Sequence, residues 1–144
     1  HQSLKSIILF TKDGQHPAAK QVLFSVLQNC SSISRFSFET DDLITLNHEE
    51  TTELLHLISK IQYLDLMNLI FSVESFPLSL PVMFSANTMI AANWSDDSRQ
   101  DELNTYIFKH ASNLEHLMLY CPTDEVLQEV IRSLVSFIEI SMRK

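Results

Sequence analysis

Glycine is almost absent from this chain: Gly14 is the single glycine among 144 residues. Loops that cradle phosphate need glycine, because only a residue without a Cβ allows positive φ and close approach of the backbone to the ligand. One glycine is too few for a P-loop or a dinucleotide-binding fingerprint. The commonest nucleotide-binding α/β enzymes are therefore excluded.

Basic residues are also scarce, with 10 Lys and Arg against 18 Asp and Glu and a net charge of −8. Binding to a nucleic-acid backbone needs clustered Lys and Arg, so we expect no nucleic-acid partner. Long apolar runs are missing too, whereas a membrane-spanning helix takes about 18 or more apolar residues in succession. We therefore expect no membrane span.

Cysteine is rare, and Cys30 and Cys121 are the two present. Two cysteines make a poor disulfide framework for a chain of this length, and cysteine prefers burial, so we expect two buried thiols. A single disulfide bridge stays an alternative. Free thiols favour an intracellular location, cytoplasmic or nuclear, although glycosylation acceptor sequences at Asn29 and Asn93 favour the opposite.

Patterns typical of catalysis or metal binding are missing as well. No HExxH or CxxC spacing occurs. Cys121 and His116 lie five residues apart, and on an extended strand they would point to opposite faces. Adjacent carboxylates such as Asp41 and Asp42 make no convincing acid/base pair. We expect no catalytic, cofactor-binding or metal site, and no enzyme activity.

The chain does contain a repeated spacing of apolar residues, in which a step of three residues is followed by a step of two. In "NLEHLMLYC" the step joins Leu114, Leu117 and Leu119. Further copies start at Leu4, Ile33, Ile61 and Val135, and a weaker alternating copy is formed by Val82, Phe84 and Ala86. The first three starts are 29 and 28 residues apart, a spacing typical of a repeat array.

Helical patterns separate these strand-like copies, at residues 16–29, 47–60, 98–113 and 123–134. Asn47 and Glu50 have the spacing of a capping box at the start of the second helix. Alternation of strands and helices predicts parallel strands, in an open doubly wound sheet or in a solenoid, and the three-then-two step favours the solenoid. Residues 70–97 are irregular, and we expect a buried strand over 81–92.

The step resembles the consensus of leucine-rich repeats, LxxLxLxx(N/C). The longer units resemble the ribonuclease-inhibitor-like or cysteine-containing subtypes, which occur in F-box substrate receptors and in nucleotide-binding innate immune receptors. The resemblance implies an irregular α/β solenoid with one curved parallel sheet and helices on the convex side. Residues 1–144 would form a single repeat domain of about five to six irregular repeats. We expect it to be a fragment of a larger chain.

In such a solenoid the concave sheet face is the contact surface. The resemblance therefore implies a non-catalytic protein-binding module, the recognition part of a larger receptor or of a ubiquitin-ligase substrate adaptor. We expect a protein partner, with further repeats or a neighbouring subunit alongside. The expected contact residues, which alternate with the inward residues of the strands, are Lys5, Arg35, Tyr63, Asp65, Glu115, His116, Met118 and Phe137.

Two other functions remain open. A small open-sheet α/β enzyme or ligand-binding domain would have its site at the carboxyl ends of the strands, at residues 11–13, 40–42 and 121–123. A structural subunit of a multi-protein assembly would use the repeat array as a spacer.

Overall fold

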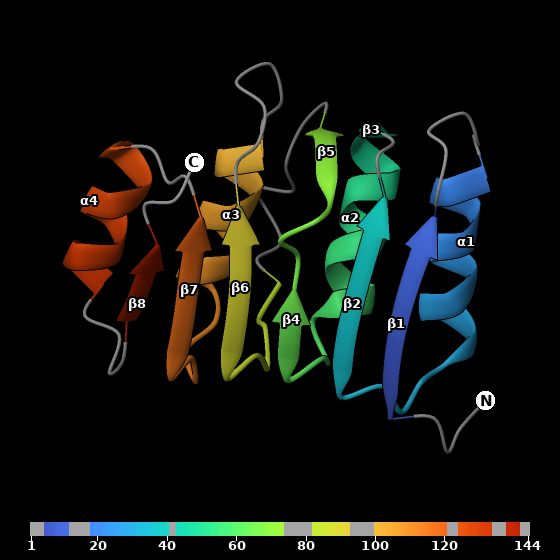
Figure 1. Ribbon diagram of the computed structural model, residues 1–144, viewed down its shortest axis with the longest axis horizontal. Helices are drawn as coiled ribbons and strands as arrows, with labels where there is room; N and C mark the ends of the chain where they lie inside the picture. Colours follow the sequence, from blue (N-terminus) through green and yellow to red (C-terminus); the bar gives the residue numbers. More distant parts are fainter. Residues whose placement is uncertain are drawn as a thin grey trace.

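The computed structural model describes residues 5–11, 18–40, 43–73, 82–92, 100–120, 124–133 and 138–141. They form a mixed α/β fold, with a sheet in one layer and helices in another (Figure 1). The strands of the main sheet are β1 Ser6–Thr11, β2 Arg35–Thr40, β4 Tyr63–Asp65, β6 Thr88–Ala92, β7 His116–Tyr120 and β8 Ile138–Ser141. The helices in these ranges are α1 Ala18–Asn29, α2 His48–Ile58, α3 Gln100–Lys109 and α4 Asp124–Ser133.

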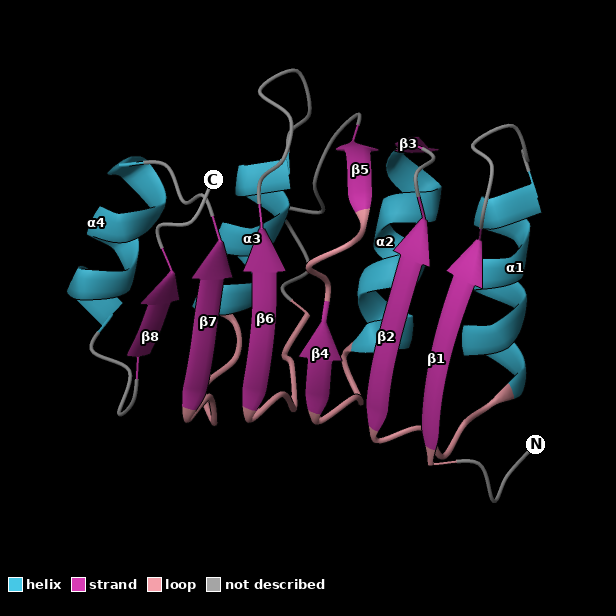
Figure 2. Ribbon diagram, viewed as in Figure 1, coloured by secondary structure: helices cyan, strands magenta, loops and turns pink. Residues whose placement is uncertain are grey.

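The main sheet follows the order of the sequence. Its six strands pair as β1-β2-β4-β6-β7-β8, and each neighbouring pair is parallel. Parallel neighbours require a connection that crosses back over the sheet, and the helices lie behind the strands in the view of Figure 2. The expected α/β chain with a parallel sheet is therefore confirmed.

A second, two-stranded sheet corrects the expectation of one sheet. Its strands β3, Leu43–Leu46, and β5, Ile70–Val73, pair in parallel. They follow β2 and β4 in the sequence and lie beyond the carboxyl ends of those strands in Figure 1. Four residues are too few to show a strand period clearly, which is why the sequence pattern did not reveal them.

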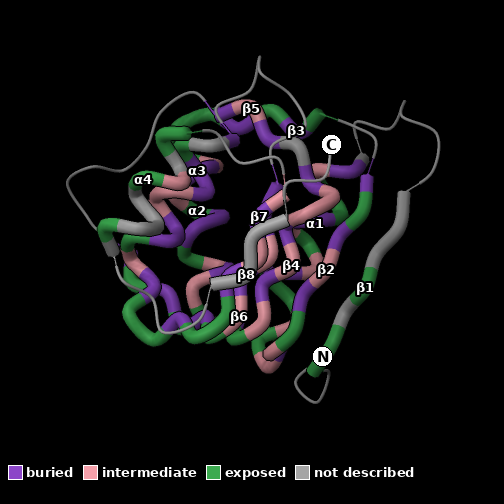
Figure 3. Tube along the Cα trace, turned by 60° about the vertical axis from the view of Figure 1, so that its left-hand side comes forward, coloured by how far each residue is buried: buried purple, intermediate pink, exposed green. Residues whose placement is uncertain are grey.

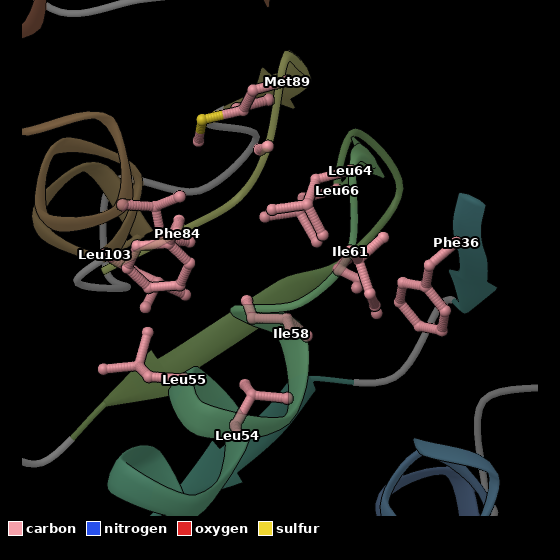
Figure 4. Close-up of a cluster of buried hydrophobic side chains, with 14 of the residues drawn as sticks. Phe36, Leu54, Leu55, Ile58, Ile61, Leu64, Leu66, Phe84, Met89 and Leu103 are labelled. Carbon is pink, nitrogen blue, oxygen red and sulfur yellow. The ribbon is translucent and has the colours of Figure 1, made fainter. Parts of the chain in front are cut away.

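The three-then-two step is explained by the hydrophobic core. Each complete described copy is buried throughout: Ile33, Phe36 and Phe38; Ile61, Leu64 and Leu66; Leu114, Leu117 and Leu119. The middle residue of a copy lies on the helix-facing side of a strand, and the first lies before the strand. The last residue lies on the same side of the strand, except that Leu66 directly follows β4. Buried and less buried residues accordingly alternate along the strands (Figure 3). Figure 4 shows strand residues of this cluster with Leu54, Leu55 and Ile58 from α2.

The strand expected over residues 81–92 is shorter and lies later. β6 begins at Thr88, and residues 82–86 form no strand although Val82, Phe84 and Ala86 are buried. Backbone N–H groups of this segment donate to carbonyls at the ends of two helices: Ser85 N to Ser59 O at 2.7 Å and Phe84 N to His110 O at 2.9 Å. The segment therefore lies between the carboxyl ends of α2 and α3.

The capping box is confirmed at the start of α2. Asn47 Oδ1 accepts a hydrogen bond from Glu50 N at 2.8 Å, and Glu50 Oε1 accepts one from Asn47 N at 3.0 Å. Lys20 Nζ, from α1, forms an ion pair with Glu50 Oε2 at 2.9 Å. The Asn47 N–H, followed by Lys20, lowers the pKa of Glu50 below its ordinary value. Glu50 therefore caps α2 and links it to the preceding helix, α1.

The cysteine expectation is met in part. Cys30 is a free thiol that is half-buried against the core. Cys121 lies outside the described residues.

Candidate functional site

The sheet has an open face, the side turned away from the described helices and toward the viewer in Figure 1. Residues paired by register point to the same side of a parallel sheet, so the open face is built in rows that cross the strands. The first row is Ser6, Arg35, Tyr63, Thr88 and His116. The second row is Ile8, Ser37, Asp65, Ile90 and Met118.

The first row contains a cation over an aromatic ring. The guanidinium carbon of Arg35, on β2, lies 4.3 Å from the ring centroid of Tyr63, on the adjacent β4. Arg35 is exposed and Tyr63 is half-buried. Such a pair is worth about 0.5–1 kcal/mol at an exposed site, and it holds the ring and the charge in a defined orientation.

The second row combines apolar side chains with a carboxylate. Ile8 is 57% exposed, and Ile90 and Met118 are half-buried. Between them Asp65 accepts hydrogen bonds from Ser37 Oγ and from Met67 N, both at 3.2 Å. Asp65 forms no ion pair within the described part of the chain. Two neutral donors thus orient the Asp65 carboxylate, and a cation of a partner could pair with it.

A ladder of backbone hydrogen bonds fixes the starts of the strands. The carbonyl of the residue before a strand accepts two N–H groups from the start of the next unit. Lys5 O accepts from Ser34 N at 2.8 Å and Arg35 N at 3.1 Å. The same pair of bonds recurs at the carbonyls of Ser34, Gln62 and Asn87. This recurrence aligns the rows of the open face across β1, β2, β4, β6 and β7.

A pocket of about 530 Å³ is lined by residues at the starts of β4, β6 and β7. These strands start at the lower edge of the sheet in Figure 1. The lining of the pocket is mostly polar: Gln62, Ser85, Asn87, Ser112, Asn113, Leu114 and Glu115. Gln62, Asn87 and Glu115 directly precede residues of the first row. The pocket therefore adjoins the open face.

The expected contact residues are distributed over these rows. Arg35, Tyr63 and His116 share the first row, and Asp65 and Met118 share the second. Lys5 and Glu115 are exposed at the starts of their strands, with Glu115 in the pocket wall. The remaining expected residue, Phe137, lies outside the described residues.

Sequence reasoning missed Thr88 and Ile90, the contributions of β6 to the two rows. A signal was present: Ala86, Met89 and Ala91 repeat the three-then-two step, and each is fully buried. Alanine and methionine are weak markers of an apolar pattern, and the alternation of Val82 and Phe84 just upstream was the stronger one.

Most residues of the alternative site at the carboxyl ends of the strands are not among those that the structure describes. Residues 12–13, 41–42 and 121–123 fall outside the described residues. Within the described ranges no group of three or more His, Cys, Asp or Glu could hold a metal ion. No helix there has the length and apolar character needed to cross a membrane.

Comparisons with protein-family models, curated proteins and solved structures gave no match.

Proposed function

We propose that this chain is a non-catalytic protein-binding module that holds its partner on the open face of the sheet. One observation carries the proposal. The register brings side chains from five strands into two rows, and the described helices all lie on the other side of the sheet. At a strand spacing of about 4.8 Å, the five strands span about 19 Å, wide enough for an extended segment of a partner.

The composition of the face favours a protein partner. Tyr63, Ile90 and Met118 provide half-buried apolar surface, and Arg35 and Asp65 provide charge of both signs beside it. Aromatic, methionine and arginine side chains are enriched in protein interfaces, where they fill pockets and form paired charges. The mixture of apolar and charged groups would supply both affinity and orientation.

We further propose that the fold is an irregular solenoid of the leucine-rich-repeat kind. The sequential order of parallel strands, the recurring ladder at the strand starts and the buried three-then-two step support this. In a solenoid each unit packs on its neighbours, so further repeats or a neighbouring subunit would continue the array. The module would then serve as the recognition part of a larger intracellular receptor or ubiquitin-ligase adaptor.

The test is affinity capture followed by a binding measurement on the partner identified. The open-face variant carries Arg35→Ala and Met118→Ala, which remove an exposed cation and a half-buried apolar side chain. The matched control carries Arg132→Ala and Met83→Ala, which are exposed on α4 and on the segment 82–86. We expect the open-face variant to bind at least about tenfold more weakly, a loss of about 1.4 kcal/mol.

Both variants should retain the circular dichroism spectrum and the unfolding midpoint of the original chain to within a few degrees. Equal loss of binding in both variants, or binding that survives the open-face changes, contradicts the proposal.

A further inference from the structure

The pocket at the starts of β4, β6 and β7 contains one charged group among its lining residues, the carboxylate of Glu115. Glu115 is exposed and forms no ion pair within the described part of the chain. The net charge of the whole chain, −8, adds to the negative potential around it. The pocket therefore favours a positively charged ligand.

Neutral acceptors surround the carboxylate. Gln62 and Asn113 each carry an amide oxygen, and these two side chains make no hydrogen bond to other described residues. Asn87 Oδ1 already accepts from Thr88 Oγ1 at 3.1 Å, which orients this third amide. Amide oxygens accept hydrogen bonds from a cationic donor and impose no charge penalty on it.

The pocket is large enough for a long side chain with a spread of donors. A volume of about 530 Å³ far exceeds a single ammonium group. A guanidinium carries five N–H donors in one plane and so reaches several acceptors at once.

We propose that this pocket binds an arginine side chain of the protein that occupies the open face. The inference rests on the proposed function, because the pocket residues Gln62, Asn87 and Glu115 directly precede Tyr63, Thr88 and His116 of the first row. A partner segment crossing β4, β6 and β7 would place one arginine over the lower edge of the sheet. The carboxylate of Glu115 would pair with it, and the amides would accept its remaining donors.

The experiment titrates isotope-labelled protein with N-acetyl-arginine amide at low salt and follows the side-chain amide signals of Gln62, Asn87 and Asn113 by NMR. The matched probe is N-acetyl-citrulline amide, which has nearly the same shape and no charge. We expect saturable shifts with arginine, with a dissociation constant of millimolar order, and much smaller shifts with citrulline. Equal responses to both probes, or no saturable response at these signals, would overturn the proposal.

Variants of single carboxylates show which group binds the arginine. Glu115→Gln removes the carboxylate at an exposed position and should weaken arginine binding about three- to fivefold, as expected for an exposed ion pair. Glu125→Gln removes an exposed carboxylate of α4, in the helix layer, and should leave the titration unchanged. If Asp65→Asn, in the second row, weakens binding and Glu115→Gln does not, the cation binds elsewhere on the open face and the pocket assignment is wrong.

The titration is independent of the capture experiment. Arginine binding that is weakened in Glu115→Gln, together with a partner insensitive to Arg35→Ala and Met118→Ala, would refute the open face as the docking site. A partner sensitive to those changes, without arginine binding in the pocket, would refute only the inference made for the pocket.

Discussion

At the scale of single residues, Glu50 combines two interactions that both favour its charged form. It accepts the Asn47 N–H within the capping box, and it pairs with Lys20 from the preceding helix. Both lower the pKa of its carboxyl below the ordinary value, and the Asn47 hydrogen bond contributes most. A carboxyl with a lowered folded-state pKa stabilises the fold at pH above its unfolded value, and this contribution is lost as pH falls through the folded value.

The lowered pKa of Glu50 predicts how the stability of a Glu50→Gln variant depends on pH. Glutamine preserves the capping geometry but not the charge, so we expect the variant to be about 0.5–1 kcal/mol less stable at pH 7. The deficit should shrink as pH is lowered below 4.5, the ordinary value of the group, because the original carboxylate then becomes protonated. Urea unfolding at a series of pH values measures it.

Glu49→Gln is the matched control, because Glu49 also lies in the first turn of α2. It should show a smaller deficit at neutral pH. A deficit for Glu50→Gln that stays constant from neutral to acidic pH would contradict the assignment.

At the scale of elements, helix α3 is anchored by a buried amide network. Gln100, its first residue, is 1% exposed, and its Oε1 accepts the backbone N–H of Phe71 from β5 at 2.8 Å. Gln100 Nε2 donates to Asn104 Oδ1 at 3.1 Å, and Asn104 Nδ2 donates to Ala92 O, at the end of β6, at 3.2 Å. One helix thereby satisfies polar groups of both sheets, which are costly to bury unpaired.

We therefore expect Gln100→Met to destabilise the chain by about 1–3 kcal/mol. The substitution keeps the size of the side chain but leaves the Phe71 N–H and part of the Asn104 amide unpaired in the interior. Gln128→Met, at an exposed position of α4, is the matched control and should change stability by less than about 0.5 kcal/mol. Chemical denaturation of the original chain and of both variants measures these differences in stability. Equal stability of the two variants would contradict the prediction and show that water replaces the lost hydrogen bonds.

The elements differ in how far the sequence reveals them, and the reason is physical. The helices were predictable because they carry local signals, such as the Asn47–Glu50 box and the acidic first turn at Asp124. The positions that β2, β4 and β7 contribute to the open face followed from alternation around inward Leu and Phe residues, whereas those of β6 did not. The strands β3 and β5 were not predictable, because four residues each are too few to show a strand period. The role of Gln100 was not predictable either, because its hydrogen bond to Phe71 N joins residues 29 positions apart and leaves no local pattern.

At the scale of the whole molecule, one buried cluster runs through the described units. It extends from Leu23 on α1 to Leu119 on β7 and includes side chains from the strands and the helix layer. Each unit contributes a few residues and cannot bury its apolar side alone. Stability should therefore be shared between neighbouring units.

The last prediction tests how far this sharing extends. Leu64 is fully buried on β4, in the middle of the sheet, and Leu64→Ala should cost about 3 kcal/mol. If the units unfold together, the protection of backbone amides against hydrogen exchange should fall by the same free energy in β2 and in β7, on either side of β4. Ile61→Val, which removes one methyl group from the same unit, should produce the same pattern at about 1 kcal/mol. Loss of protection in β4 and β2 with β7 unchanged would instead mean that the array unfolds unit by unit. Some strands of the open face could then unfold while the other strands stay folded.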